Sequence, residues 1–138
     1  ALGLENNVSY YHWSFWNWHL LTGAGLVLSP RSAELILIKE RRPYPDLLST
    51  NLHFSQGDCE ISEVVWSEAE KILRISLHED YLPRSGELAI SVPATYQLKN
   101  VENASYLRTD GEVIILKRLP LKFPEVKICF TKSALSSN

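Results

Sequence analysis

The chain has 138 residues, 22% of them charged, and a formal net charge of −2 at pH 7. This length fits one domain with a sizeable core, and the near-neutral charge argues against nucleic acid as a partner. No apolar run approaches the about 20 residues of a transmembrane helix, so we expect no membrane partner either.

The first predicted element is an aromatic segment that holds three of the chain's four tryptophans, Trp13, Trp16 and Trp18. If the segment is one strand, Trp13 and Phe15 share one face and Trp16 lies on the other, so both faces carry rings. Such rings are buried in a core, contact a neighbouring domain, or form a stacking surface for a sugar. Trp13, Phe15, Trp16 and Trp18 are therefore the candidate residues for a domain interface or a sugar contact.

A hydrophobic period of two predicts further strands along the chain, because alternate residues of a strand face the same side. Residues 73–77, 88–92 and 126–130 follow this pattern, and residues 113–116 are apolar on both faces, which is typical of a central strand. A strand-like run around Pro30 and two weaker candidates complete the set. The run covers residues 25–38, and the weaker candidates are 51–55 and 61–66.

Turn residues separate these runs. Asp110-Gly111 gives the best hairpin signal, and the polar residues 67–71 are interpreted as a hairpin loop rather than a helix. Short strands at intervals of about 8–12 residues without helices indicate an antiparallel sandwich or barrel. We therefore predict an all-β fold, an antiparallel two-sheet β-sandwich, formed as a single domain by residues 1–138.

No motif in the chain predicts catalysis or metal binding. Four acids could serve a glycosidase, but none lies in a recognisable motif, and a triad of Ser49, His53 and Asp58 lacks a nucleophile elbow. The histidines have no metal-binding spacing. We expect no catalytic, cofactor or metal residue here. The acids are Asp46, Asp58, Glu60 and Glu63, and the histidines are His12, His19, His53 and His78.

Features related to processing leave the compartment open. The chain begins with Ala1 and contains no methionine, so we expect a processed product or a domain of a longer protein. Asn7-Val8-Ser9 and Asn103-Ala104-Ser105 are sequons that, if used, would fit a secreted or lysosomal protein. Cys59 and Cys129 could pair only if the fold brings their Cα atoms within about 7 Å.

Several short motifs follow one another in a characteristic order. They read FWN at 15–17, PRS at 30–32, PDLLSTNLHFSQG at 45–57, VVW at 64–66 with LRI at 73–75, and GELAISVP at 86–93. The order and spacing resemble the C-terminal β-sandwich of melibiase-type glycoside hydrolases, the α-galactosidases and related retaining α-glycosidases. That family has FW(D/N), PRS or PHS, P-x-LL-(S/G)T-x-x-H-x-x-QG, a V-x-W-D…L-x-I hairpin and an l-x-i-x-vP strand. One departure is Ser14, where the family often has an acid.

The resemblance implies a non-catalytic role for this chain. In these enzymes the catalytic carboxylates lie in a preceding (β/α)8 barrel, and nothing here matches that barrel. No catalytic residue is therefore carried over. The resemblance implies an accessory C-terminal domain of a longer protein, which packs on the catalytic barrel, stabilises it, and hydrolyses nothing by itself.

Two alternatives remain open. A carbohydrate-binding module would require exposed, coplanar rings among Tyr10, Trp13, Trp16 and Trp18. An immunoglobulin-like adhesion domain would place Trp66 beside a Cys59–Cys129 pair between its sheets, although the order of these residues in the chain fits that fold poorly.

Overall fold

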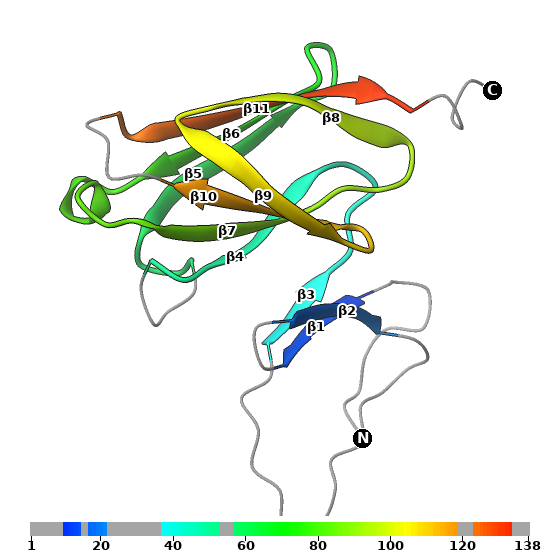
Figure 1. Cartoon of the computed structure of the whole chain (residues 1–138), viewed down its shortest axis with the longest axis horizontal. Helices are drawn as coiled ribbons and strands as arrows, with labels where there is room; N and C mark the ends of the chain where they lie inside the picture. Colours follow the sequence, from blue (N-terminus) through cyan, green and yellow to red (C-terminus); the bar gives the residue numbers. More distant parts are fainter. Residues whose placement is uncertain (1–9, 15–16, 22–36, 53–56, 119–122, 134–138) are drawn as a thin grey trace, which may run out of the picture. The chain divides into compact units, whose positions relative to one another are not determined.

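The computed structural model describes residues 10–14, 17–21, 37–52, 57–118 and 123–133. The chain divides into two compact units, residues 1–42 and residues 43–138. The sheets in both units are antiparallel (Figure 1). The described elements are β1 (Tyr10–Ser14), β2 (Asn17–Leu21), β3 (Leu37–Glu40), β4 (Asp46–Thr50), β5 (Ile61–Ser67), β6 (Ile72–Leu77), the short 3-10 turn η1 (Glu79–Tyr81), β7 (Gly86–Ser91), β8 (Tyr96–Glu102), β9 (Ala104–Asp110), β10 (Val113–Arg118) and β11 (Glu125–Lys132).

The first unit contains a three-stranded sheet in the order β2-β1-β3. The aromatic segment is therefore two short strands and not the single strand considered from the sequence, because the chain reverses after Ser14 and β2 begins at Asn17. Pairing the two halves gives their backbone donors and acceptors partners within the hairpin. Of the strand predicted over residues 25–38, the described part lies in β3, and residues 25–36 lie outside the described residues.

The second unit is a sandwich of two four-stranded antiparallel sheets. One has the order β4-β7-β10-β9, hereafter the β4 sheet, and the other has the order β5-β6-β11-β8, hereafter the β5 sheet. Both contribute fully buried side chains to one core, such as Leu88 and Leu116 from the β4 sheet and Leu73 and Ile128 from the β5 sheet. The predicted all-β, two-sheet sandwich is confirmed. The prediction of one domain over residues 1–138 is not tested by the division into units and stays a prediction.

The central position predicted for residues 113–116 is confirmed. β10 lies between β7 and β9 in the β4 sheet. Ile114 and Leu116 point into the core, while Val113 and Ile115, on the opposite face, are also buried. The Arg108–Glu87 ion pair, 3.5 Å long, joins β9 to β7 and so crosses this second face of β10.

The strand candidate at residues 51–55 is wrong where it is described, because β4 ends at Thr50, before the candidate begins. At Asn51 the backbone N–H still donates a 3.1 Å hydrogen bond to the backbone oxygen of Glu87, and the side-chain Oδ1 accepts a 2.5 Å bond from the backbone N–H of Glu87. A Cβ at Gly86 would lie 2.6 Å from Asn51 Oδ1 and 2.7 Å from Leu52 Cδ2, so a larger residue at this position would force these side chains to shift. The described chain is bent at residues 51 and 52, and residues 53–56 lie outside it.

Both predicted hairpin loops are confirmed. Residues 68–71 form the turn between β5 and β6. Gly111 and Glu112 form the loop between β9 and β10, where Gly111 has a φ of +62°. A positive φ at the first loop position matches the right-handed twist of the flanking strands, and glycine adopts it at the least cost.

β8 and β9 join the two sheets at one side of the sandwich. Each is the edge strand of its sheet, and a single residue, Asn103, separates them. Asn103 has a φ of +67°, and its side-chain Nδ2 donates a 2.7 Å hydrogen bond to the backbone oxygen of Glu125 at the start of β11. This bond holds the junction of the two edge strands against the β5 sheet.

Candidate functional site

The candidate residues of the aromatic segment are only partly described. Trp13 lies in β1 directly opposite Trp18 in β2, and the same hairpin sets His12 opposite His19. Phe15 and Trp16 lie outside the described residues. A domain-interface or sugar-contact role for Trp13, Phe15, Trp16 and Trp18 therefore stays a prediction, as does the binding module built on these rings.

The remaining tryptophan, Trp66, is the centre of an aromatic cluster in the sandwich. It pairs with the buried Leu73 across β5 and β6, which places it on the inner face. Its ring centroid lies 6.2 Å from that of Tyr44 in a parallel arrangement, and edge-on contacts join it to Tyr96 at 5.3 Å and Phe130 at 5.9 Å. Tyr44, Trp66, Tyr96 and Phe130 are called the Trp66 cluster.

One carboxylate accepts hydrogen bonds from two rings of the Trp66 cluster. Glu68, in the β5–β6 turn, accepts bonds from Trp66 Nε1 at 2.9 Å and from the Tyr96 hydroxyl at 2.7 Å, both on Oε2. The ammonium groups of Lys71 and Lys132 lie 3.3 and 3.4 Å from Oε1. Lys132 Nζ also lies 4.2 Å from the centre of the Tyr96 ring, a cation–π distance.

This network shifts the ionisation of its members. The hydrogen bond from Tyr96, followed by that from Trp66, lowers the pKa of Glu68 from 4.5 to about 2. Burial, followed by the bond to Glu68, raises the pKa of Tyr96. A carboxylate with so low a pKa stays charged near neutral pH and has no proton to give. Glu68 therefore suits a structural role and not that of a general acid.

Glu60, one of the four acids considered for catalysis, is fully buried. Its carboxylate accepts a 2.5 Å bond from Thr50 Oγ1 and a 2.8 Å bond from the backbone N–H of Gly57. These bonds tie the end of β4 to the turn before β5. A carboxylate without solvent access cannot contact a substrate, so Glu60 is a structural acid.

The other candidates for chemistry do not form a site in the described structure. Asp58 and Glu63 are exposed, Asp46 is half-buried, and Ser49 is buried in β4. His53 lies outside the described residues, so the Ser49-His53-Asp58 arrangement considered from the sequence is not tested. Among the described residues, no group of three or more His, Cys, Asp or Glu side chains could hold a metal ion. That part of the chain also contains no helix long and apolar enough to cross a membrane.

The two cysteines bear on the immunoglobulin-like alternative. Cys59 is exposed just before β5, and Cys129 is half-buried in β11 of the same β5 sheet. No disulfide joins these two described residues. The bridge between sheets that this alternative requires beside Trp66 is therefore not formed.

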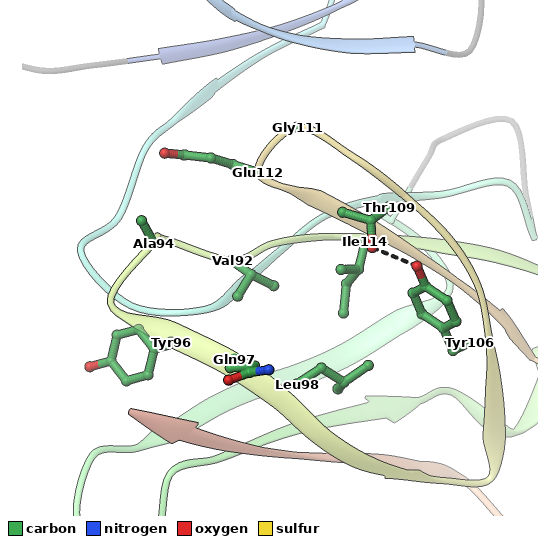
Figure 2. Close-up of a pocket in the computed structure, with 10 residues that line it drawn as sticks. All are labelled: Val92, Ala94, Tyr96, Gln97, Leu98, Tyr106, Thr109, Gly111, Glu112 and Ile114. Atoms are coloured by element: carbon green, nitrogen blue, oxygen red, sulfur yellow. Dashed lines mark hydrogen bonds between the residues drawn. The ribbon is translucent and has the colours of Figure 1, made fainter. Parts of the chain in front are cut away.

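A cleft opens between β8 and β9, with a volume of about 470 Å³. Figure 2 shows Tyr96 and Tyr106 at opposite ends of the cleft, with Val92, Leu98 and Ile114 between them. Tyr106 is 50% exposed, and its hydroxyl is 2.7 Å from Thr109 Oγ1. The remaining lining residues are Ala94, Gln97, Gly111 and Glu112.

Sequence reasoning missed both the Trp66 cluster as a unit and the cleft. In the sequence Trp66 belongs to the VVW motif and to the immunoglobulin-like alternative, and no pattern there indicates the contacts of Tyr106. Comparisons with protein-family models, with curated proteins and with solved structures found no match for this chain. The chemistry of the sites must therefore be argued from their own residues.

Proposed function

We propose that this chain is a non-catalytic accessory domain of an α-glycosidase, which packs on the catalytic (β/α)8 barrel of its parent protein and stabilises it. The observation that carries the proposal is where the resembling motifs lie in the sandwich. PDLLST overlaps β4, VVW lies in β5, LRI lies in β6, and GELAIS forms β7. Motifs that follow one another in the sequence thus occupy consecutive strands of a fold of the implied class.

The acids of the second unit support a structural role. Glu60 and Glu68 both accept several hydrogen bonds from the protein itself. Retaining glycosidases instead need two carboxylates about 5–5.5 Å apart beside the substrate, and neither of these acids is available for that task.

The edge strand β5 offers a surface that a neighbouring domain could cover. Val64 and Val65 point to opposite faces of this strand, and both are exposed, at 38% and 42%. Exposed edge strands with apolar side chains tend to be covered in the functional protein, because they otherwise promote association with other chains. A barrel in the same chain would provide such a cover at a high effective concentration.

The first test is hydrolysis. The purified 138-residue chain should release no nitrophenol from p-nitrophenyl α-galactoside above the buffer rate, while an active α-galactosidase serves as the positive control. Release by the chain that persists through repurification would contradict a non-catalytic role.

The second test concerns the partner. The coding sequence before Ala1 should specify a (β/α)8 barrel with acidic residues at the carboxyl ends of two strands. Removing the present chain from that protein should lower the melting temperature of the barrel. An upstream sequence without a barrel would refute the proposal.

A further inference from the structure

Among the described edge strands of the sandwich, β5 has the longest regular backbone. The other three edges are β4, β8 and β9. β8 and β9 each have a register shift in their middle, and β4 has one beside the buried Leu48. In β5 the shift lies at the start, at Ser62, whose hydroxyl donates a 3.1 Å hydrogen bond to the backbone oxygen of Ser76. Residues 63–67 then pair with β6 without interruption.

A regular edge strand offers its backbone to a further strand. Alternate residues of an antiparallel strand turn their N–H and C=O groups away from the neighbouring strand, so part of the backbone of residues 63–67 faces away from β6. Proteins commonly protect such an edge with lysine, proline or a bulge. Residues 63–67 read EVVWS and contain none of these.

Apolar side chains are exposed on both faces of this edge. Val64 and Trp66 lie opposite the fully buried Ile75 and Leu73 of β6, so they belong to the core-facing side of the β5 sheet. Val64 is nevertheless 38% exposed, and Val65, on the outer side, is 42% exposed. A strand added to β5 would therefore cover apolar surface on both faces as well as form backbone hydrogen bonds.

The sequence of residues 63–67 complements itself. In an antiparallel pair of two copies related by a two-fold axis through Val65, this residue lies opposite its own counterpart. Val64 then lies opposite Trp66, so apolar side chains meet on the core-facing side. Glu63 lies opposite Ser67 on the outer side, and no like charges face each other.

The neighbouring registers are less favourable. An axis through Glu63 would set two carboxylates opposite each other, which destabilises a strand pair. An axis through Val64 would set the irregular backbone at Ser62 opposite Trp66 and so interrupt the pairing. The axis through Val65 uses the whole regular segment and avoids both problems.

We propose that β5 binds a second copy of this chain by antiparallel pairing of residues 63–67, with the two-fold axis at Val65. The pairing would join two four-stranded β5 sheets into one continuous sheet. The net charge of −2 per chain opposes this contact only weakly. Because the contact is a short strand pair, it is smaller than the about 1,200–2,000 Å² of a stable interface, and the expected dissociation constant is on the order of 100 µM.

A second copy fits β5 better than a barrel does. A two-fold contact requires a surface that complements itself, and residues 63–67 provide one. The barrel of the proposed function would then pack on another surface of the sandwich. The dimer contact therefore does not depend on the accessory role, and each proposal has its own test.

The test is sedimentation equilibrium of the purified 138-residue chain at concentrations from about 5 to 500 µM. The average mass should rise from that of a monomer toward that of a dimer over this range. Val65→Lys should weaken dimerisation at least about tenfold, because two ammonium groups would lie opposite each other at the axis. A melting temperature within about 3 °C of the parent shows that the variant is folded.

A matched control and a rescue experiment locate the contact. Leu107→Lys adds the same charge at a 41% exposed position of the edge strand β9, and it should leave dimerisation unchanged. Val65→Glu should dimerise as poorly as Val65→Lys. An equimolar mixture of these two variants should recover the dimer, since a lysine and a glutamate side chain then face each other across the axis.

Four results would overturn the inference. The parent chain could stay monomeric at about 500 µM. Val65→Lys could dimerise like the parent, which would place the contact elsewhere, or Leu107→Lys could lose the dimer equally, which would show a general effect of charge. A mixture that stays monomeric would exclude the register about Val65. None of these results bears on the accessory function, which is tested by the stability of the barrel in the parent enzyme.

Discussion

The Trp66 cluster and the β8–β9 cleft use the same kinds of aromatic residue for different purposes. In the cluster, Trp66 contacts three other rings, and its polar nitrogen shares the Glu68 carboxylate with Tyr96. In the cleft, Tyr106 also has its hydroxyl bonded, but half of its surface is open to solvent. In both regions the polar atom of the ring is hydrogen-bonded. What differs is how much of the ring is covered by other side chains, and this distinguishes a ring that packs in the core from a ring that is open to a ligand.

The largest expected effect is the loss of the central ring of the cluster. Trp66→Ala should lower the free energy of unfolding by about 3 kcal/mol, because it removes ring contacts and leaves a cavity. Urea denaturation measures this change. Trp66→Phe keeps most of the packing and loses only the Nε1 bond, so it should cost clearly less. A loss below about 1 kcal/mol for Trp66→Ala would show that the cluster does not stabilise the sandwich.

A smaller effect is expected from Glu68, and it should depend on pH. Because the folded pKa of Glu68 is lowered from 4.5 to about 2, its stabilisation is complete above about pH 4.5 and is lost as the pH falls toward 2. The carboxylate is 55% exposed, so solvent screening limits the contribution to about 1 kcal/mol or less.

Glu68→Gln removes this titration. Its unfolding free energy should therefore fall less steeply than that of the parent chain between pH 4.5 and 2. Unfolding by urea at several pH values compares the two slopes. Equal slopes would mean that the bonds from Trp66 and Tyr96 do not favour the charged form.

The smallest effect should come from the cleft. Tyr106→Ala should change the free energy of unfolding by no more than about 0.5 kcal/mol, because the residue lies on an edge strand and is half exposed. Urea denaturation beside Trp66→Ala gives a direct comparison. A cost approaching that of Trp66→Ala would remove the distinction between the two regions.

The sequence predicted the strands whose hydrophobic period is unbroken. Leu73, Ile75 and Leu77 alternate without interruption, and all three are buried in β6 as the period requires. The apolar run at 113–116 likewise predicted the central strand β10. These features are local, so a single chain segment is enough to reveal them.

β8 was not predicted, and β9 was indicated only beside its turn, because bulges break their period. In β8, Leu98 pairs with Phe130 while Asn100 pairs with Cys129, so Lys99 is an extra residue. A bulge of this kind shifts the inward positions by one and hides the strand from a search for alternation. A second register shift occurs in β9 beside Leu107.

The cleft could not be predicted for a related reason. Leu98 and Tyr106 come close only because β8 and β9 are the edges of two different sheets, which is a property of the whole topology. The Glu68 network likewise joins the β5–β6 turn to residues at the start of β8 and the end of β11. No spacing within one segment indicates such contacts.

The side-chain amide of Asn103 has a consequence for the processing of the protein. Asn103 begins one of the two sequons, and N-linked glycosylation would attach a bulky sugar to its Nδ2 atom. In the folded chain that nitrogen donates to Glu125, and the residue is half-buried with a positive φ. The structural role of Asn103 at the junction of β8 and β9 explains why an asparagine occupies this position. The sequon that begins at Asn103 is therefore weak evidence for a secreted protein.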